Sequence, residues 1–175
     1  MAADLLDLVV EFRSKVELTL ADCKDTGHEL RPFFTFRDPW TQARLWRQSR
    51  TFDQIIKARD RLAAAGAPYL SRVLMDAGPS SGKWATNALP GQSFHQFGEA
   101  VDCFVVGPNG EAIWDDRHPG YKFYAERAQF HGLTAGYFWG SSPDAVHIQF
   151  RPASSPLHIL SWPQIDKAMK ERFGG

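Results

Sequence analysis

The sequence predicts an α+β fold in which a small antiparallel sheet is flanked by helices. Three observations support this class. Amphipathic segments with helical periodicity recur along the chain, the candidate strands are short, and these strands follow tight turns instead of alternating regularly with helices. The chain has 175 residues, of which 43% are hydrophobic and 23% charged, so it is long enough to bury a core of its own. We therefore predict a single domain over residues 1–175.

The N-terminal part of the chain is predicted to be a helix, a strand and a second helix. Residues 3–22 place apolar side chains at helical spacing, so residues 1–30 form an N-terminal helix and its lead-in. Residues 30–37 are rich in Phe and have the pattern of a short strand. Asp38-Pro39 then supplies an N-cap and a first-turn proline for a helix that reaches about Gln48.

Two capping boxes predict the remaining terminal and inserted helices. The sequence TFDQ at Thr51–Gln54 opens a helical insertion over residues 51–77. Residues 76–91, rich in Gly, Ser and Pro, follow as a loop. The second box, SWPQ at Ser161–Gln164, opens a C-terminal helix within residues 155–175.

The middle of the chain carries the strands of the predicted sheet. Val101–Val106 is one strand, and the turn at Pro108–Gly110 returns the chain into Glu111–Trp114 as a hairpin. Tyr121–His131 has helical periodicity, and Ala145–Phe150 is the last strand.

Composition excludes several classes of function. The 20 basic and 20 acidic side chains balance, and no basic run appears, so we expect no nucleic-acid partner. No apolar run reaches the length of a membrane span. The N-terminus carries Asp4 and Asp7 and lacks a basic signal-peptide region, so synthesis in the cytoplasm without a signal peptide is expected. Cys23 and Cys103 form no metal or disulfide motif and are predicted to be buried thiols of a monomer.

Two strands carry side chains that suit a metal. Alternation in the last strand puts His147 and Gln149 on the face opposite Val146 and Ile148. In the earlier strand it puts Asp102, together with Phe104, on the face opposite Val101, Cys103 and Val105. If the strands pair, His147 and Asp102 meet on one face of the sheet, and His95 can fold back from its loop to join them. Two imidazoles and one carboxylate are a zinc ligand set that leaves a fourth position for water.

Asp144 lies in the turn before His147, where its carboxylate could act as a general base. Each of these residues also has an ordinary structural explanation. A strand histidine is often only hydrogen-bonded, and aspartate is common in turns. Asp102 is the exception, because a buried carboxylate needs a partner. Spacing alone therefore leaves both alternatives open.

The same residues resemble a known family. The segment SFHQFGEAVD, Ser93–Asp102, is similar to the SxHxxGxAxD signature of the LAS zinc peptidases, and Asp144–His147 is similar to their second signature. This family contains D-Ala-D-Ala carboxypeptidases and L-Ala-D-Glu endopeptidases, including phage endolysins. The resemblance implies the LAS/Hedgehog-like metallopeptidase fold. It also implies that Zn²⁺ is bound by His95, Asp102 and His147, and that Asp144 is the catalytic acid/base.

The resemblance extends to the segment around Arg37. Phe36-Arg37, followed by Gln42, resembles the family element whose arginine polarises the scissile carbonyl or stabilises the oxyanion, so the resemblance implies this role for Arg37. Asp38 stands where the family has serine. Residues expected to bind substrate on the same basis are Gln42, Ser93 and Trp139.

We therefore predict a zinc metallopeptidase that hydrolyses peptidoglycan stem peptides, with an L-Ala-D-Glu endopeptidase as the expected activity. It would act on the cell wall after release by a holin, by lysis or by another non-classical route. The alternative is a D-Ala-D-Ala carboxypeptidase, which must also bind a free C-terminal carboxylate. The cations considered for that purpose are Arg31, Arg37, Arg50 and Lys83. Alternatives from other classes are a catalytically inert zinc-stabilised cell-wall binding module and a metal-free interaction domain.

Overall fold

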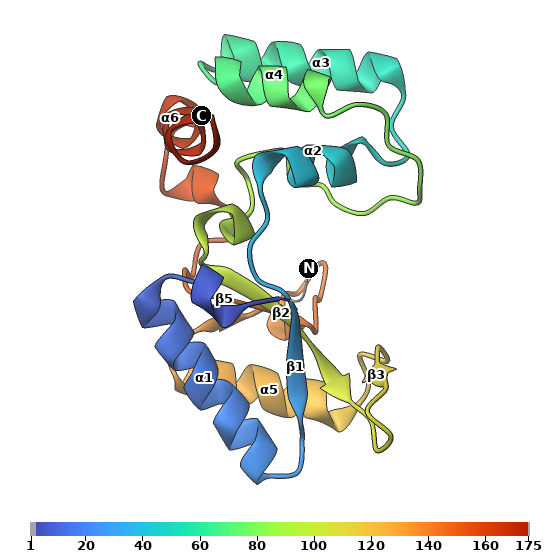
Figure 1. The fold of residues 1–175 in the computed structure, drawn as a ribbon, viewed down its shortest axis with the longest axis vertical. Helices are drawn as coiled ribbons and strands as arrows, with labels where there is room; N and C mark the ends of the chain where they lie inside the picture. The colour runs from blue at the N-terminus through green and yellow to red at the C-terminus, as the bar shows by residue number, and fades with distance from the viewer. Residues whose placement is uncertain (1–2, 175) are drawn as a thin grey trace. The chain divides into compact units, whose positions relative to one another are not determined.

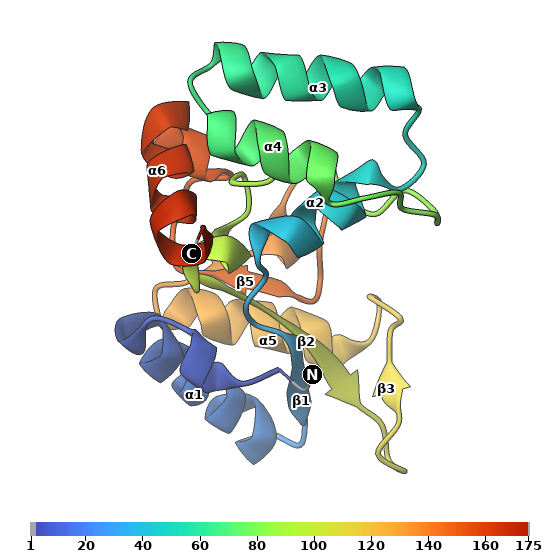
Figure 2. The same cartoon turned by 45° about the horizontal axis from the view of Figure 1, so that its top comes forward.

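The structure is a computed structural model that describes residues 3–174, and these residues form two compact units. The first unit contains the chain up to Phe36 together with Phe97–Pro152. The second contains Arg37–Gln96 together with the chain from Ala153 onward. Figure 1 and Figure 2 show the elements of both in chain order.

The first unit is an antiparallel sheet with two long helices. Its strands follow the order β1-β2-β5-β4, and β3 pairs with β2 as the predicted hairpin. Every pair is antiparallel, which confirms the predicted α+β class. The elements are η1 (Leu5–Asp7), α1 (Val10–Asp25), β1 (Leu30–Phe34), β2 (Ala100–Val106), β3 (Ala112–Ile113), α5 (Pro119–Phe130), β4 (Thr134–Ala135), η3 (Gly136–Phe138) and β5 (His147–Gln149).

One face of this sheet forms the core with α1 and α5. The apolar side chains of β2 and β5 that point to this face are fully buried against both helices. Alternation along the strands therefore directs the intervening side chains of β2 and β5 to the opposite face. The largest contributors to the core are Phe12, Val16, Val101, Val105, Tyr121, Tyr124 and Ile148.

The N-terminal helix differs from the prediction for residues 3–22. The Asp4 side chain accepts a hydrogen bond from Leu6 N and closes a separate 3-10 turn, and α1 begins only at Val10. Val9 N donates to Gly98 O over 3.0 Å, a tertiary bond that the local sequence does not reveal. Leu6 is one of the apolar residues of the predicted helix, but it lies in the 3-10 turn and is 72% exposed.

The predicted pairing of the two strands that carry the candidate metal ligands is confirmed. Asp102 on β2 lies directly opposite His147 on β5. The strand predicted over residues 145–150 is shorter, because pairing is limited to His147–Gln149. Strand β4, which also pairs with β5, was not predicted, since two residues are too few for a periodic signal.

The second unit is helical, and its predicted helix starts are confirmed. The Asp38 carboxylate accepts from Thr41 N over 2.8 Å, and Thr51 and Ser161 each form the expected capping box. The insertion consists of two helices joined by a short turn. The elements of this unit are α2 (Pro39–Arg47), α3 (Phe52–Ala64), α4 (Pro68–Asp76), η4 (Pro156–His158) and α6 (Trp162–Phe173), and η2 (Phe94–Phe97) precedes β2.

Cys23 and Cys103 are both free and buried, as predicted. Burial raises the pKa of each thiol to about 12, so both remain protonated at neutral pH. None of the helices within residues 3–174 is long and apolar enough to cross a membrane.

The N-terminus of α4 is capped from another helix. This helix has no side-chain cap of its own, and the buried Asp166 of α6 accepts from Leu70 N over 2.8 Å and from Tyr69 N over 3.3 Å. One carboxylate thus satisfies two N–H groups that would otherwise lack a partner and holds α6 against α4.

We expect Asp166→Ala to lower the free energy of unfolding by about 1–2 kcal/mol, because it removes this cap from buried N–H groups. Urea denaturation measures the change. Asp25→Ala, at an exposed position, is the control and should change stability by less than about 0.5 kcal/mol. Equal effects of the two substitutions would show that Asp166 does not act as a cap.

Candidate metal centre

The centre is built on the pairing of β2 with β5. Asp102 and His147 occupy facing positions of these strands and are each only 8% exposed. His147 Nδ1 and Asp102 Oδ1 lie 2.9 Å apart. The strand register therefore positions two of the three predicted ligands without any contribution from loops.

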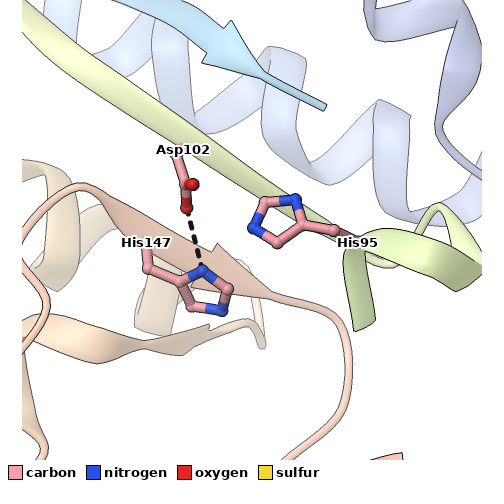
Figure 3. A group of neighbouring side chains, drawn as sticks. All are labelled: His95, Asp102 and His147. Atoms are coloured by element: carbon pink, nitrogen blue, oxygen red, sulfur yellow. Dashed lines mark hydrogen bonds and ion pairs between the residues drawn. The ribbon is translucent and has the colours of Figure 1, made fainter. Parts of the chain in front are cut away.

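His95 completes the group from η2, which immediately precedes β2. It is 2% exposed, and one ligand atom from each of His95, Asp102 and His147 lies within 4.8 Å of the others. Figure 3 shows the three side chains turned toward a common point. Gly98 lies in the turn between the first two ligands with φ of +69°, and a Cβ there would lie 2.8 Å from Asp7 O. A larger residue would therefore strain the turn that leads from His95 to Asp102.

Gln149 determines which nitrogen of His147 faces Asp102. The Gln149 amide nitrogen donates to Arg151 O over 2.6 Å, so its Oε1 is the atom that lies 3.1 Å from His147 Nε2. An amide oxygen can only accept, so Nε2 donates to it, and Nδ1 is the nitrogen that faces the Asp102 carboxylate. This nitrogen either carries a proton that it donates to Asp102 or, once deprotonated, can bind a metal ion together with that carboxylate.

The pKa of His147 is consistent with a site that attracts positive charge. Burial lowers this pKa, but the hydrogen bond to Asp102 and the charges of Asp102 and Asp144 raise it, and the net shift is upward. The same negative charges favour a divalent cation, which competes with the proton for Nδ1.

The ligand set suits zinc. Two imidazole nitrogens and one carboxylate oxygen at a buried position are typical of catalytic zinc sites with three protein ligands, which keep a fourth position open for water or substrate. At such sites a residue outside the ligand set often accepts a hydrogen bond from the ligating imidazole, which orients the ring and fixes its tautomer. Gln149 would do this for His147.

Asp144 lies beside this centre in the turn before β5. Its carbonyl accepts from His147 N over 3.3 Å, and its own N donates to Gly136 O over 2.9 Å. A Cβ on Gly136 would lie 2.6 Å from Asp144 O and 3.3 Å from His147 Cβ, so only glycine allows this close approach. The half-buried Trp139 adds a wall, with its ring centroid 5.2 Å from that of His147.

Arg37 is attached to the same segment as His95. Its backbone N donates to His95 O over 3.3 Å, and its Nη1 donates to Gln42 Oε1 over 3.0 Å. Gln42 is fully buried, and its Nε2 donates to Ala88 O over 2.7 Å. Both ends of the Gln42 amide therefore bind groups of the protein. Ser93, half-buried at the start of this segment, accepts from Gln96 N through its carbonyl.

Two residues of the centre were not assigned a function from the sequence. Gln149 lies two positions after His147 on the same strand face, and this period of two is the signal that could have identified it. Gly136 carries no local signal, because its importance arises from a tertiary contact with Asp144.

Comparison with known proteins adds an independent observation. The family model VanY, D-alanyl-D-alanine carboxypeptidase, matches residues 7–139. Among solved structures, the chain is similar to a single-residue mutant of the vancomycin resistance D,D-pentapeptidase VanY from a VanB-type resistance cassette, in complex with Zn(II). The two sequences are 16% identical, the match covers 90% of this chain and 83% of that one, and the TM-score is 0.48. No curated protein sequence matches the chain.

We expect Gln149→Met to weaken zinc binding by about 10–100-fold, because His147 then loses the acceptor that fixes its tautomer. Competition with a chromophoric chelator measures the affinity. Gln129→Met, an exposed glutamine on α5, is the matched control and should bind zinc like the wild type. Unchanged affinity in the Gln149 variant would contradict the tautomer assignment.

Proposed function

Because the chain belongs to the VanY family of D-alanyl-D-alanine carboxypeptidases, we propose that it removes the C-terminal D-alanine from peptidoglycan stem peptides. The family and the ligand set together make it a zinc peptidase of peptidoglycan. The observation that carries the proposal is the buried group of His95, Asp102 and His147, with Asp144 in the turn before β5, where its charge acts on His147.

His95, Asp102 and His147 would hold the metal. When bound there, Zn²⁺ acts as a Lewis acid that polarises the scissile carbonyl and lowers the pKa of water. The chain itself supplies the proton transfers. A carboxylate oxygen of Asp144 takes the proton of the attacking water and returns it to the leaving amine of D-alanine. The backbone bonds of Asp144 to Gly136 and His147 keep this carboxylate in its turn.

Arg37 would stabilise the negative charge that develops on the carbonyl oxygen of the substrate. A cation fulfils this purpose only if it is held in place before the reaction. We assign Gln42 to this positioning rather than to substrate binding, since its amide already binds Arg37 and Ala88. The binding of substrate by Ser93 and Trp139 remains a proposal, supported for Trp139 by its position against His147.

A carboxypeptidase must also hold the free carboxylate at the end of its substrate. Of the four cations considered from the sequence, Arg50 is engaged elsewhere, because its two terminal nitrogens donate to Trp46 O and Thr86 O. Arg31 stands in an ion pair with Glu29 over 3.1 Å, which leaves Arg37 and Lys83 as the candidates for this carboxylate.

The L-Ala-D-Glu endopeptidase expected from the sequence is the second candidate. It would use the same metal site and differ only in the bond presented to it. The inert binding module is less well supported, because the chain contains Asp144 and Arg37, the residues that we propose as base and oxyanion cation. We further propose that the protein acts as a monomer on the cell wall, after release from the cell in which it is made.

Digestion of pentapeptide-containing peptidoglycan by the zinc-loaded protein tests the proposal. We expect free D-alanine and new tetrapeptides by mass spectrometry. New N-terminal D-glutamate would instead identify the endopeptidase, and the absence of any product would contradict a peptidase.

Asp144→Ala should keep its zinc and lose turnover by about 10²–10⁴-fold, the usual contribution of a general base. Elemental analysis and the rate of D-alanine release measure the two properties. Asp116→Ala, an exposed aspartate, is the control. Turnover at the wild-type rate in the Asp144 variant would refute the base assignment.

Gln42→Leu should lower kcat about tenfold and change KM little, because Arg37 loses its acceptor while the substrate loses no contact of its own. Gln42→Glu keeps an acceptor for Arg37 but cannot donate to Ala88 O, and it should recover most of kcat. A merely structural function of Gln42 predicts that both variants lose activity together. A large rise in KM would restore Gln42 as a substrate-binding residue.

A further inference from the structure

A groove in the helical unit has no function in the reaction described above. Its volume is about 570 Å³, within the range of small-molecule sites. It lies at the end of α2, along α3 and against the loop before η2. The side chains that matter to the argument are Trp46, Arg50, Lys57, Asp60, Arg61 and Trp84.

One wall of the groove is an aromatic surface fixed from behind. The Arg50 guanidinium lies 3.9 Å from the ring centroid of Trp46 and 3.9 Å from that of Trp84, so it is sandwiched between the two indoles. Arg50 also donates to Trp46 O and, over 2.9 Å, to Thr86 O. Trp46 is 6% exposed, whereas Trp84 is 55% exposed. Trp84 is thus held on one face and presents the rest of its surface to solvent.

The other wall carries positive charge. Lys57 and Arg61 lie one turn apart on α3, and neither has an ion-pair partner within residues 3–174. Asp60 also lines the groove, but Arg59 Nε lies 2.7 Å from its carboxylate and offsets its charge. A ligand in the groove would therefore meet an aromatic face together with two available cations.

We propose that this groove binds the muramyl end of the peptidoglycan substrate. The pyranose ring would stack its C–H groups on the negative face of Trp84, and the free carboxylate of the acidic stem residue would face Lys57 and Arg61. The positive charge of Lys57 and Arg61 complements the acid, and the exposed indole of Trp84 suits the apolar face of a sugar ring. This assignment rests on the proposed action on peptidoglycan.

The groove is connected to the reaction through one short loop. Arg50, behind Trp84, holds Thr86 O, and Gln42 holds Ala88 O and the Arg37 guanidinium. The aromatic wall and the proposed oxyanion cation are therefore attached to the same residues, 86–88. Binding of the muramyl end would anchor the substrate at this loop without taking part in bond cleavage, and it should lower KM rather than raise kcat.

The kinetic test compares a free stem pentapeptide with the same peptide joined to N-acetylmuramic acid. The wild type should show a KM about tenfold lower for the muramyl substrate. Trp84→Ala and the double variant Lys57→Gln/Arg61→Gln should abolish this difference and leave the free peptide unaffected. The matched controls are Phe52→Ala, an exposed aromatic outside the groove on α3, and Lys167→Gln on α6, and both should keep the difference.

A binding measurement separates this proposal from the proposed activity. Muramyl dipeptide with a free carboxylate is titrated into the Asp144→Ala protein, so that the ligand remains intact, and tryptophan fluorescence is recorded with and without Trp84→Ala. Saturable binding that depends on Trp84 supports the groove even if neither pentapeptide is cleaved, in which case the proposed activity alone fails. Cleavage of both pentapeptides with equal KM overturns the groove and leaves the activity standing. Binding that survives Trp84→Ala, or tighter binding of adenosine monophosphate, overturns the muramyl assignment.

Discussion

The structure depends on the meeting of Asp102 and His147 across β2 and β5. A buried carboxylate is costly unless it is paired, and here its partner is the Nδ1 atom of a buried imidazole 2.9 Å away. A proton or a metal ion at Nδ1 satisfies this pairing. Because the two residues lie opposite each other on β2 and β5, a metal ion would also join the two strands, and Gln149 holds Nδ1 toward the carboxylate by accepting from Nε2.

Much of this arrangement could be predicted from the sequence, and the reason differs from one element to the next. The helix starts at Asp38, Thr51 and Ser161 were predictable because a cap is a local signal. Strand alternation placed Asp102 and His147 on one face, but only the family resemblance added His95 with any specificity. The family match confirms that resemblance and, with the ligand set, the zinc peptidase class. The start of α1, strand β4 and the contact of Gly136 depend on tertiary bonds, which no local pattern records.

Asp38 stands where the family has serine, and this difference leaves the neighbouring Arg37 in a well-defined position. Aspartate caps α2 as serine would, through bonds to the N and Oγ1 of Thr41. Arg37 is therefore the last residue before the capped helix, with its backbone bound to His95 O and its side chain bound to Gln42 within α2. The replacement of the family's serine by Asp38 therefore changes the residue that caps α2. It does not release Arg37, the cation that we place at the oxyanion.

The bond that the enzyme cleaves is decided away from the metal. The proposed ligands and the proposed base Asp144 would serve a terminal or an internal peptide bond equally, so specificity would come from the groups that bind the rest of the stem. Arg50 illustrates how the structure restricts these groups. From the sequence it was a candidate for the substrate carboxylate, but its guanidinium is stacked between two indoles and two of its five N–H groups donate to carbonyls, so less of it is available to a carboxylate. Its effect on the substrate is therefore indirect, through the position of Trp84 and of residues 86–88.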